Sequence, residues 1–86
     1  MAYKSDLYKR QHYIYRAYIG DELAYIGVTT NPAGRFSKHS RKPWWDQVTE
    51  ITFEEAENRL RAFDSERTYI ITERPKYNVA YLNGRF

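Results

Sequence analysis

Apolar and aromatic residues are concentrated in two short segments near the start of the chain. Residues 12–18 and 23–28 carry tyrosine, isoleucine and alanine at the density typical of strands. Gly20-Asp21-Glu22 lies between them and has the composition of a tight turn. The pattern therefore predicts an antiparallel pair of strands joined by a hairpin turn.

A first helix is predicted to start at Asn31-Pro32. Asparagine is a favoured N-cap, and proline is tolerated at the first helical position, where its missing N–H does no harm. We expect this helix to run from about Pro32 to Ser40 and to end before Pro43. Trp44-Trp45 would follow on a loop, where closing a small core is favoured over stacking on bases.

The second half of the chain predicts one more strand and one more helix. Val48, Ile51 and Phe53 indicate a third strand, and residues 58–73 have helical periodicity that Pro75 brings to an end. The apolar stripe expected on this helix consists of Leu60, Phe63, Ile70 and Ile71. The order strand, strand, helix, strand, helix predicts a mixed α+β fold, with a small three-stranded antiparallel sheet flanked by helices.

Size and composition limit what such a chain can do. With 86 residues and no cysteine, we expect a single domain over residues 12–86, preceded by a basic arm at 1–11, with no disulfide or thiolate zinc site. The net charge of +3 is compatible with a polyanionic partner. No apolar run has the length of a membrane span, so we expect no membrane partner and a cytoplasmic, intracellular location.

Five polar positions stand out as candidate chemistry. Tyr15 and Tyr25 lie on neighbouring predicted strands, so their hydroxyls can meet at one edge, although packing across strands is the commoner role of tyrosine. Glu66 shares a helix face with Ala62, Phe63 and Ile70. A carboxylate there needs a metal or a partner, and pairing with Arg59 or Arg67 is the alternative.

Basic residues on and after the first helix form the second part of this set. Arg35 and His39 lie four positions apart, so they project from one side of the predicted helix. Arginine can clamp a phosphate and histidine can transfer a proton, whereas an ordinary solvated face is the alternative. Lys38, Arg41 and Lys42 would at most follow a phosphate backbone.

Together these motifs resemble the GIY-YIG nuclease domain over roughly residues 12–79. Tyr25-Ile26-Gly27 is the second signature triplet, and Tyr13-Ile14-Tyr15 resembles the first, with tyrosine in place of glycine at position 13. Tyr18-Ile19-Gly20 spells the same triplet but lies too close to Tyr15 to be the second motif. The later positions that carry the resemblance are Arg35, His39, Lys42-Pro43-Trp44-Trp45, Glu66 and Pro75-Lys76-Tyr77-Asn78.

The resemblance implies a metal-dependent endonuclease that hydrolyses phosphodiester bonds in DNA, with RNA not excluded. It implies that Glu66 holds one Mg²⁺ (or Mn²⁺), that Tyr15 or Tyr25 accepts the proton of the attacking water, and that Arg35 neutralises charge on the phosphate. His39 would assist proton transfer or hold the phosphate. Asn78 would order the site, and a targeting partner or a homodimer would supply specificity.

Two other classes of function remain open on the sequence. A catalytically weak or silent nucleic-acid-binding module would keep the basic surface without the chemistry. A small basic interaction domain would require all these spacings to be coincidental.

Overall fold

The computed structural model of this protein describes residues 10–37 and 42–78, with only the backbone described for residues 35–37. Three strands form one antiparallel sheet in the order β2-β1-β3. This confirms the expected mixed α+β class. The elements are β1 (His12–Ile19), β2 (Glu22–Thr29), α2 (Pro32–Ser37), the 3₁₀ turn η1 (Trp45–Gln47), β3 (Glu50–Ala56) and α3 (Arg59–Glu73).

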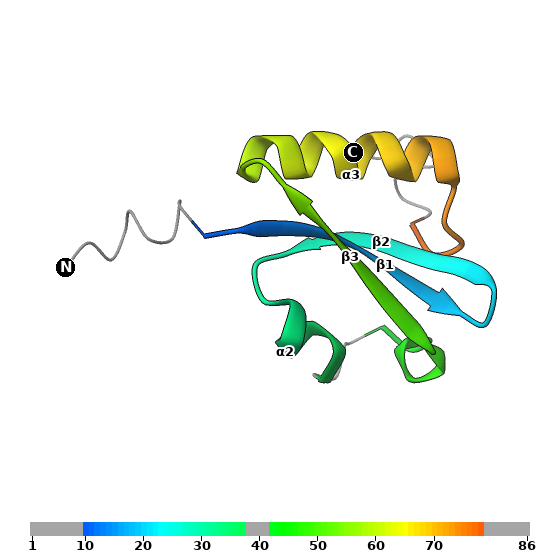
Figure 1. Ribbon diagram of the computed structural model, residues 1–86. Helices are drawn as coiled ribbons and strands as arrows, with labels where there is room; N and C mark the ends of the chain where they lie inside the picture. The colour runs from blue at the N-terminus through cyan, green and yellow to red at the C-terminus, as the bar shows by residue number, and fades with distance from the viewer. Residues whose placement is uncertain (1–9, 38–41, 79–86) are drawn as a thin grey trace.

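The two faces of the sheet are covered by different layers (Figure 1). Helix α3 lies across one face, while α2 and the segment containing η1 lie on the other. Because β1 is the central strand, its successive side chains point alternately into these two layers. Ile14 packs toward α3, and Tyr15 packs with the tryptophans on the opposite side.

The hairpin between β1 and β2 forms where the sequence predicts it. Gly20 has a φ of +60° in the turn, a backbone conformation that glycine adopts without steric cost. The register pairs Tyr15 with Gly27 and shifts between Ala17 and Tyr18. The Tyr18-Ile19-Gly20 triplet therefore belongs to the end of β1 and its turn, with its glycine required by the turn geometry.

The N-terminal end of α2 is capped by an asparagine side chain, as the sequence predicts. The backbone N–H of Gly34 donates to Asn31 Oδ1 at 3.1 Å, which confirms the predicted cap of α2. Helix α2 extends to Ser37, and the predicted remainder up to Ser40 lies outside the described residues.

Among residues 10–37 and 42–78, no helix has the length and apolar character needed to cross a membrane.

The apolar stripe expected on α3 is wrong. Leu60 is 73% exposed, and Phe63 and Ile71 are each 46% exposed, so only Ile70 of the predicted stripe is buried. The face that meets the sheet consists instead of Ala62, Glu66, Tyr69, Ile70 and Glu73, at helical spacing. Apart from the buried Ile70, this face consists of a small residue, two carboxylates and a tyrosine, so hydropathy alone assigns the wrong side of the helix.

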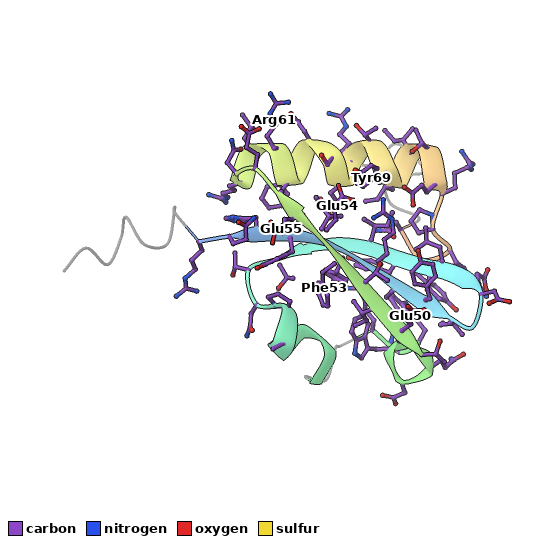
Figure 2. The ribbon with its side chains drawn as sticks, in the orientation of Figure 1. Glu50, Phe53, Glu54, Glu55, Arg61 and Tyr69 are labelled. Atoms are coloured by element: carbon purple, nitrogen blue, oxygen red, sulfur yellow. The ribbon has the colours of Figure 1, made fainter. Side chains whose placement is uncertain are left out.

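Arg16 explains why α3 turns polar residues toward the sheet. Its guanidinium donates to both carboxylate oxygens of Glu73, at 2.9 and 2.8 Å, and to Glu54 at 3.3 Å. The Tyr69 hydroxyl donates to Glu54 at 2.8 Å, and the guanidinium lies 4.4 Å from the centre of the Tyr69 ring. Glu54 and Tyr69 face one another between β3 and α3 (Figure 2). This network joins β1, β3 and the last turns of α3.

The ion pair between Arg16 and Glu73 makes the free energy of unfolding depend on pH in the acid range. Hydrogen bonds from Arg16 lower the pKa of Glu73 below its ordinary 4.5, so Glu73 stabilises the fold above that value. We expect the free energy of unfolding to fall as the pH drops from about 4.5 through the lowered pKa of the folded state. Glu73→Gln should reduce this pH dependence, measured by urea denaturation between about pH 3 and 7.

Glu57→Gln is the matched control for this substitution. Glu57 forms an exposed 3.8 Å pair with Arg61, a kind of pair that contributes little to stability, so its loss should leave the pH profile almost unchanged. Equal profiles for Glu73→Gln and the wild-type protein would contradict the role of the Arg16 network.

Candidate functional site

Tyr15 and Tyr25 lie side by side on the sheet face opposite α3. Their ring centroids are 6.1 Å apart, with the ring planes tilted by 36°. Tyr15 is buried and comes from the central strand β1, whereas Tyr25 is half-buried and comes from the edge strand β2. The structure thus brings the two predicted tyrosines together.

Gly27 makes the position of Tyr15 possible. A Cβ atom on Gly27 would lie 2.6 Å from the ring and hydroxyl of Tyr15, much closer than two such atoms approach. The tyrosine ring therefore occupies the space above a residue that has no side chain. At position 13 the strand is regular and Tyr13 pairs with Thr29, so tyrosine is accommodated there in place of glycine.

Two tryptophan side chains at the start of η1 pack against the tyrosine pair. Trp45 meets Tyr15 edge to face at 6.5 Å, and Trp44 lies 5.5 Å from Tyr25. Trp44 also stacks on Tyr77, with centroids 4.5 Å apart and planes 7° from parallel. Both tryptophans are buried, which confirms that they close a core.

Lys42 is the predicted phosphate-contacting lysine whose side chain is described. Its Nζ lies 4.7 Å from the centre of the Tyr25 ring, within the range of a cation–π interaction. A positive charge therefore lies beside the tyrosine pair. Arg35 is on α2 but only its backbone is described, and Lys38, His39 and Arg41 lie outside the described residues.

Asn78 is bonded to the backbone of β2 at Ile26, between Tyr25 and Gly27. The Ile26 N–H donates to Asn78 Oδ1 at 3.0 Å, and Asn78 Nδ2 donates to the Ile26 carbonyl at 3.1 Å. The preceding residues continue this pairing, since Lys76 and Tyr77 donate their N–H groups to Leu23 and Ala24. Asn78 is buried, so its amide fixes the outer edge of β2 beside Tyr25 and Gly27.

Glu66 approaches the sheet from α3, on the face opposite the tyrosines. It is half-buried between Ala62 and Ile70, and burial raises the pKa of its carboxyl above the ordinary 4.5. Within the described part of the chain, burial is the cause of this shift and no charged partner of the carboxylate contributes to it. Glu66 is thus a partly desolvated carboxylate that a cation would stabilise.

The donor set around Glu66 suits only certain metals. Across residues 10–37 and 42–78, no group of three or more histidine, cysteine, aspartate or glutamate side chains could hold a metal. A single carboxylate does not suffice for zinc, which takes three or four protein ligands. It fits Mg²⁺, which keeps most of its waters and is held by one or two carboxylates.

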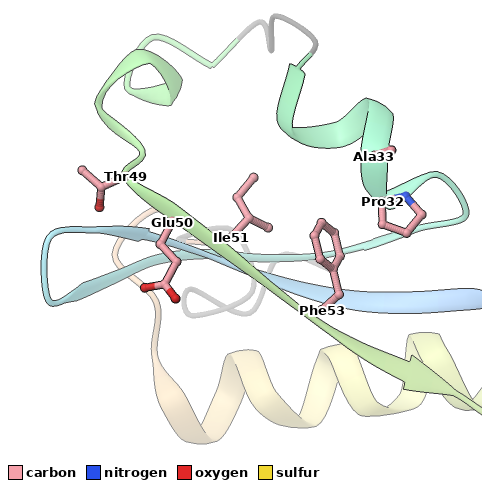
Figure 3. Close-up of a pocket in the computed structure, with 6 residues that line it drawn as sticks. All are labelled: Pro32, Ala33, Thr49, Glu50, Ile51 and Phe53. Atoms are coloured by element: carbon pink, nitrogen blue, oxygen red, sulfur yellow. The ribbon is translucent and has the colours of Figure 1, made fainter.

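A groove of about 480 Å³ lies on the tyrosine face between α2 and β3, outside the predicted catalytic set (Figure 3). Ile51 and Phe53 point from β3 toward Pro32 and Ala33 at the start of α2. The sequence pattern predicts only that Phe53 belongs to the third strand. The available signal was that Phe53 has the strand parity of Ile51, which places both on one face.

Comparison of the chain with protein-family models, with curated proteins and with solved structures found no match.

Asn78→Ala should destabilise the fold by about 1–3 kcal/mol, because it removes both bonds to Ile26 and leaves a buried N–H without its acceptor. The check is urea denaturation together with amide hydrogen exchange, in which the Ile26 amide should lose protection. Gln47→Ala removes an exposed amide and should change neither readout. Unchanged protection of Ile26 would contradict the anchoring role of Asn78.

Proposed function

We propose that this protein is a metal-dependent endonuclease of the GIY-YIG type that hydrolyses phosphodiester bonds in DNA. The observation that carries the proposal is the tyrosine pair: Tyr15 fills the space above Gly27 and lies beside Tyr25, with the ammonium of Lys42 next to the Tyr25 ring. A plain aromatic core does not need hydroxyls at these two positions or a cation beside them. The half-buried carboxylate of Glu66, whose pKa burial raises, is the second support.

The edge strand β2 determines where such a site would form. The sheet separates the tyrosine face from α3, so side chains of the two layers can act on one phosphate only around an edge. Strand β2 carries Tyr25 and Gly27 and is an outer strand. The phosphate would therefore bind at the outer edge of β2, near the segment that Asn78 anchors.

In hydrolysis a water oxygen bonds to phosphorus while the bond from phosphorus to the leaving oxygen breaks. One of the two tyrosines, as its phenolate, would accept the proton of the water and become a neutral phenol, and the ammonium of Lys42 would stabilise the phenolate form of Tyr25 before that transfer. Arg35 would neutralise charge on the phosphate oxygens. Glu66 would hold Mg²⁺, which supplies charge stabilisation at the leaving oxygen when bound.

Glu66→Gln should lower cleavage by about 10³-fold or more, because the amide no longer supplies a charged metal ligand. The measurement is nicking of supercoiled plasmid and of branched DNA with Mg²⁺, Mn²⁺ or EDTA. DNA binding in EDTA and the urea midpoint should remain close to those of the wild-type protein. Glu57→Gln, an exposed carboxylate two residues before the start of α3, is the control.

Paramagnetic Mn²⁺ gives this experiment a readout besides activity. Its binding should broaden the amide signals of Gly27 and its neighbours in wild-type protein and not in Glu66→Gln. Retained cleavage in Glu66→Gln would refute the metal site, whereas DNA binding without cleavage in the wild-type protein would favour a nucleic-acid-binding module.

Substitution of the tyrosines by phenylalanine should separate the chemistry from the packing. The variant that loses the proton acceptor, Tyr15→Phe or Tyr25→Phe, should cleave about 10²- to 10⁴-fold more slowly with little change in stability. Tyr18→Phe is the matched control, since Tyr18 lies at the end of β1 and should be dispensable. Single-turnover cleavage rates test this, and three equally active variants would contradict a tyrosine base.

A further inference from the structure

Phe53 lies on the tyrosine face of the sheet, on the opposite outer strand from Tyr25. It is the cross-strand partner of Tyr15, and β3 is the outer strand on the side away from Tyr25. Its ring is 39% exposed, although Tyr13 packs edge-on against it at 6.4 Å. An aromatic ring supported on one side by a strand neighbour is thus accessible at the edge of the sheet.

The groove beside Phe53 has the size and lining of a site for a flat aromatic group. Its volume of about 480 Å³ falls within the range of small-molecule pockets, and its walls are mainly apolar. Phe53 and Ile51 form one wall and the start of α2 forms the other (Figure 3). A nucleobase stacked on Phe53 would fill such a space, since every base offers a π face.

The distribution of charge indicates which part of a DNA strand would face β3. On the β2 side, Lys42 places its ammonium 4.7 Å from the centre of the Tyr25 ring, and Glu22 at the start of β2 is paired with Lys76 at 3.8 Å. On the β3 side, Glu50 lines the groove. On β3, Glu55 is exposed and has the same strand parity as Phe53. Phosphates are therefore attracted to the β2 side and repelled from β3, which leaves a base rather than the backbone to meet Phe53.

We propose that the groove between α2 and β3 binds an unpaired base of the DNA substrate, stacked on Phe53, and so directs cleavage to DNA that contains an unpaired nucleotide. The inference rests on the proposed function in taking DNA as the substrate. Two strand spacings separate Phe53 from Gly27, roughly 10 Å. The bound base would thus belong to a nucleotide next to, or close to, the one whose phosphate lies at the β2 edge.

The test uses the full chain with DNA duplexes that carry one unpaired 2-aminopurine, beside the same duplex fully paired. In EDTA, stacking on Phe53 should quench the fluorescence of the unpaired base, and wild-type protein should bind the duplex with the unpaired base more tightly. Phe53→Leu keeps an apolar side chain but removes the ring. It should abolish the quenching and reduce the preference by roughly tenfold, as expected for the loss of one base–aromatic stack.

Two further variants keep this test specific. Phe53→Tyr retains an aromatic face and should restore quenching and preference, whereas Phe63→Ala removes an exposed phenylalanine on the opposite layer and should change neither. Unquenched fluorescence with wild-type protein, or an unchanged preference in Phe53→Leu, would overturn the proposal.

The result is independent of the nuclease assignment because binding is measured without metal. Quenching that depends on Phe53, combined with no cleavage of any substrate, would support the base-binding groove and reject the nuclease. Cleavage that needs Glu66 but shows no preference for unpaired nucleotides would support the nuclease and reject the base-binding groove.

Discussion

The central position of β1 is the constraint on which the rest of the molecule depends. A central strand is bonded on both sides, so its alternating side chains have to serve two separate layers. Ile14 and Arg16 face α3, where one supplies an apolar contact and the other binds Glu73. Tyr15 faces the opposite layer and brings its phenol over Gly27. A slip of one residue in register would exchange these roles, so strand pairing fixes both the core and the candidate site.

Local features of the sequence predict most of the fold, because turns and caps are set by short-range chemistry. The glycine turn at Gly20 and the asparagine cap at Asn31 both form as expected. The orientation of α3 could not be predicted in the same way, since it is decided by a long-range partner. Arg16 is 57 positions from Glu73, and its paired guanidinium draws a polar side of the helix onto the sheet. Leu60 remains in solvent as a result, against the hydropathy pattern.

Part of the candidate site could be predicted from the sequence, because that part is built by local structure. Tyr15 and Tyr25 are brought together by the hairpin, a local structure whose register follows from its turn. The contact between Asn78 and Ile26 spans 52 positions and gives no local signal. The environment of Glu66 depends on how closely α3 approaches the sheet, which is set by Ala62 and Ile70 on either side. Burial raises the pKa of the Glu66 carboxyl, a property that no sequence pattern encodes.

The size of the chain explains why function would be divided between the two edges of the sheet. A chain of 86 residues is too small to enclose a deep cavity, so the polymeric substrate of the proposed nuclease would be held on the surface. The outer strand β2 carries Tyr25 and is fixed by Asn78, which gives rigid support for chemistry on a phosphate. The outer strand β3 carries an exposed aromatic ring at Phe53 beside a groove, which is suited to hold a base. Because β1 lies between β2 and β3, Tyr15 pairs with Gly27 on one side and with Phe53 on the other. A single DNA strand that crossed the sheet would therefore meet both outer strands.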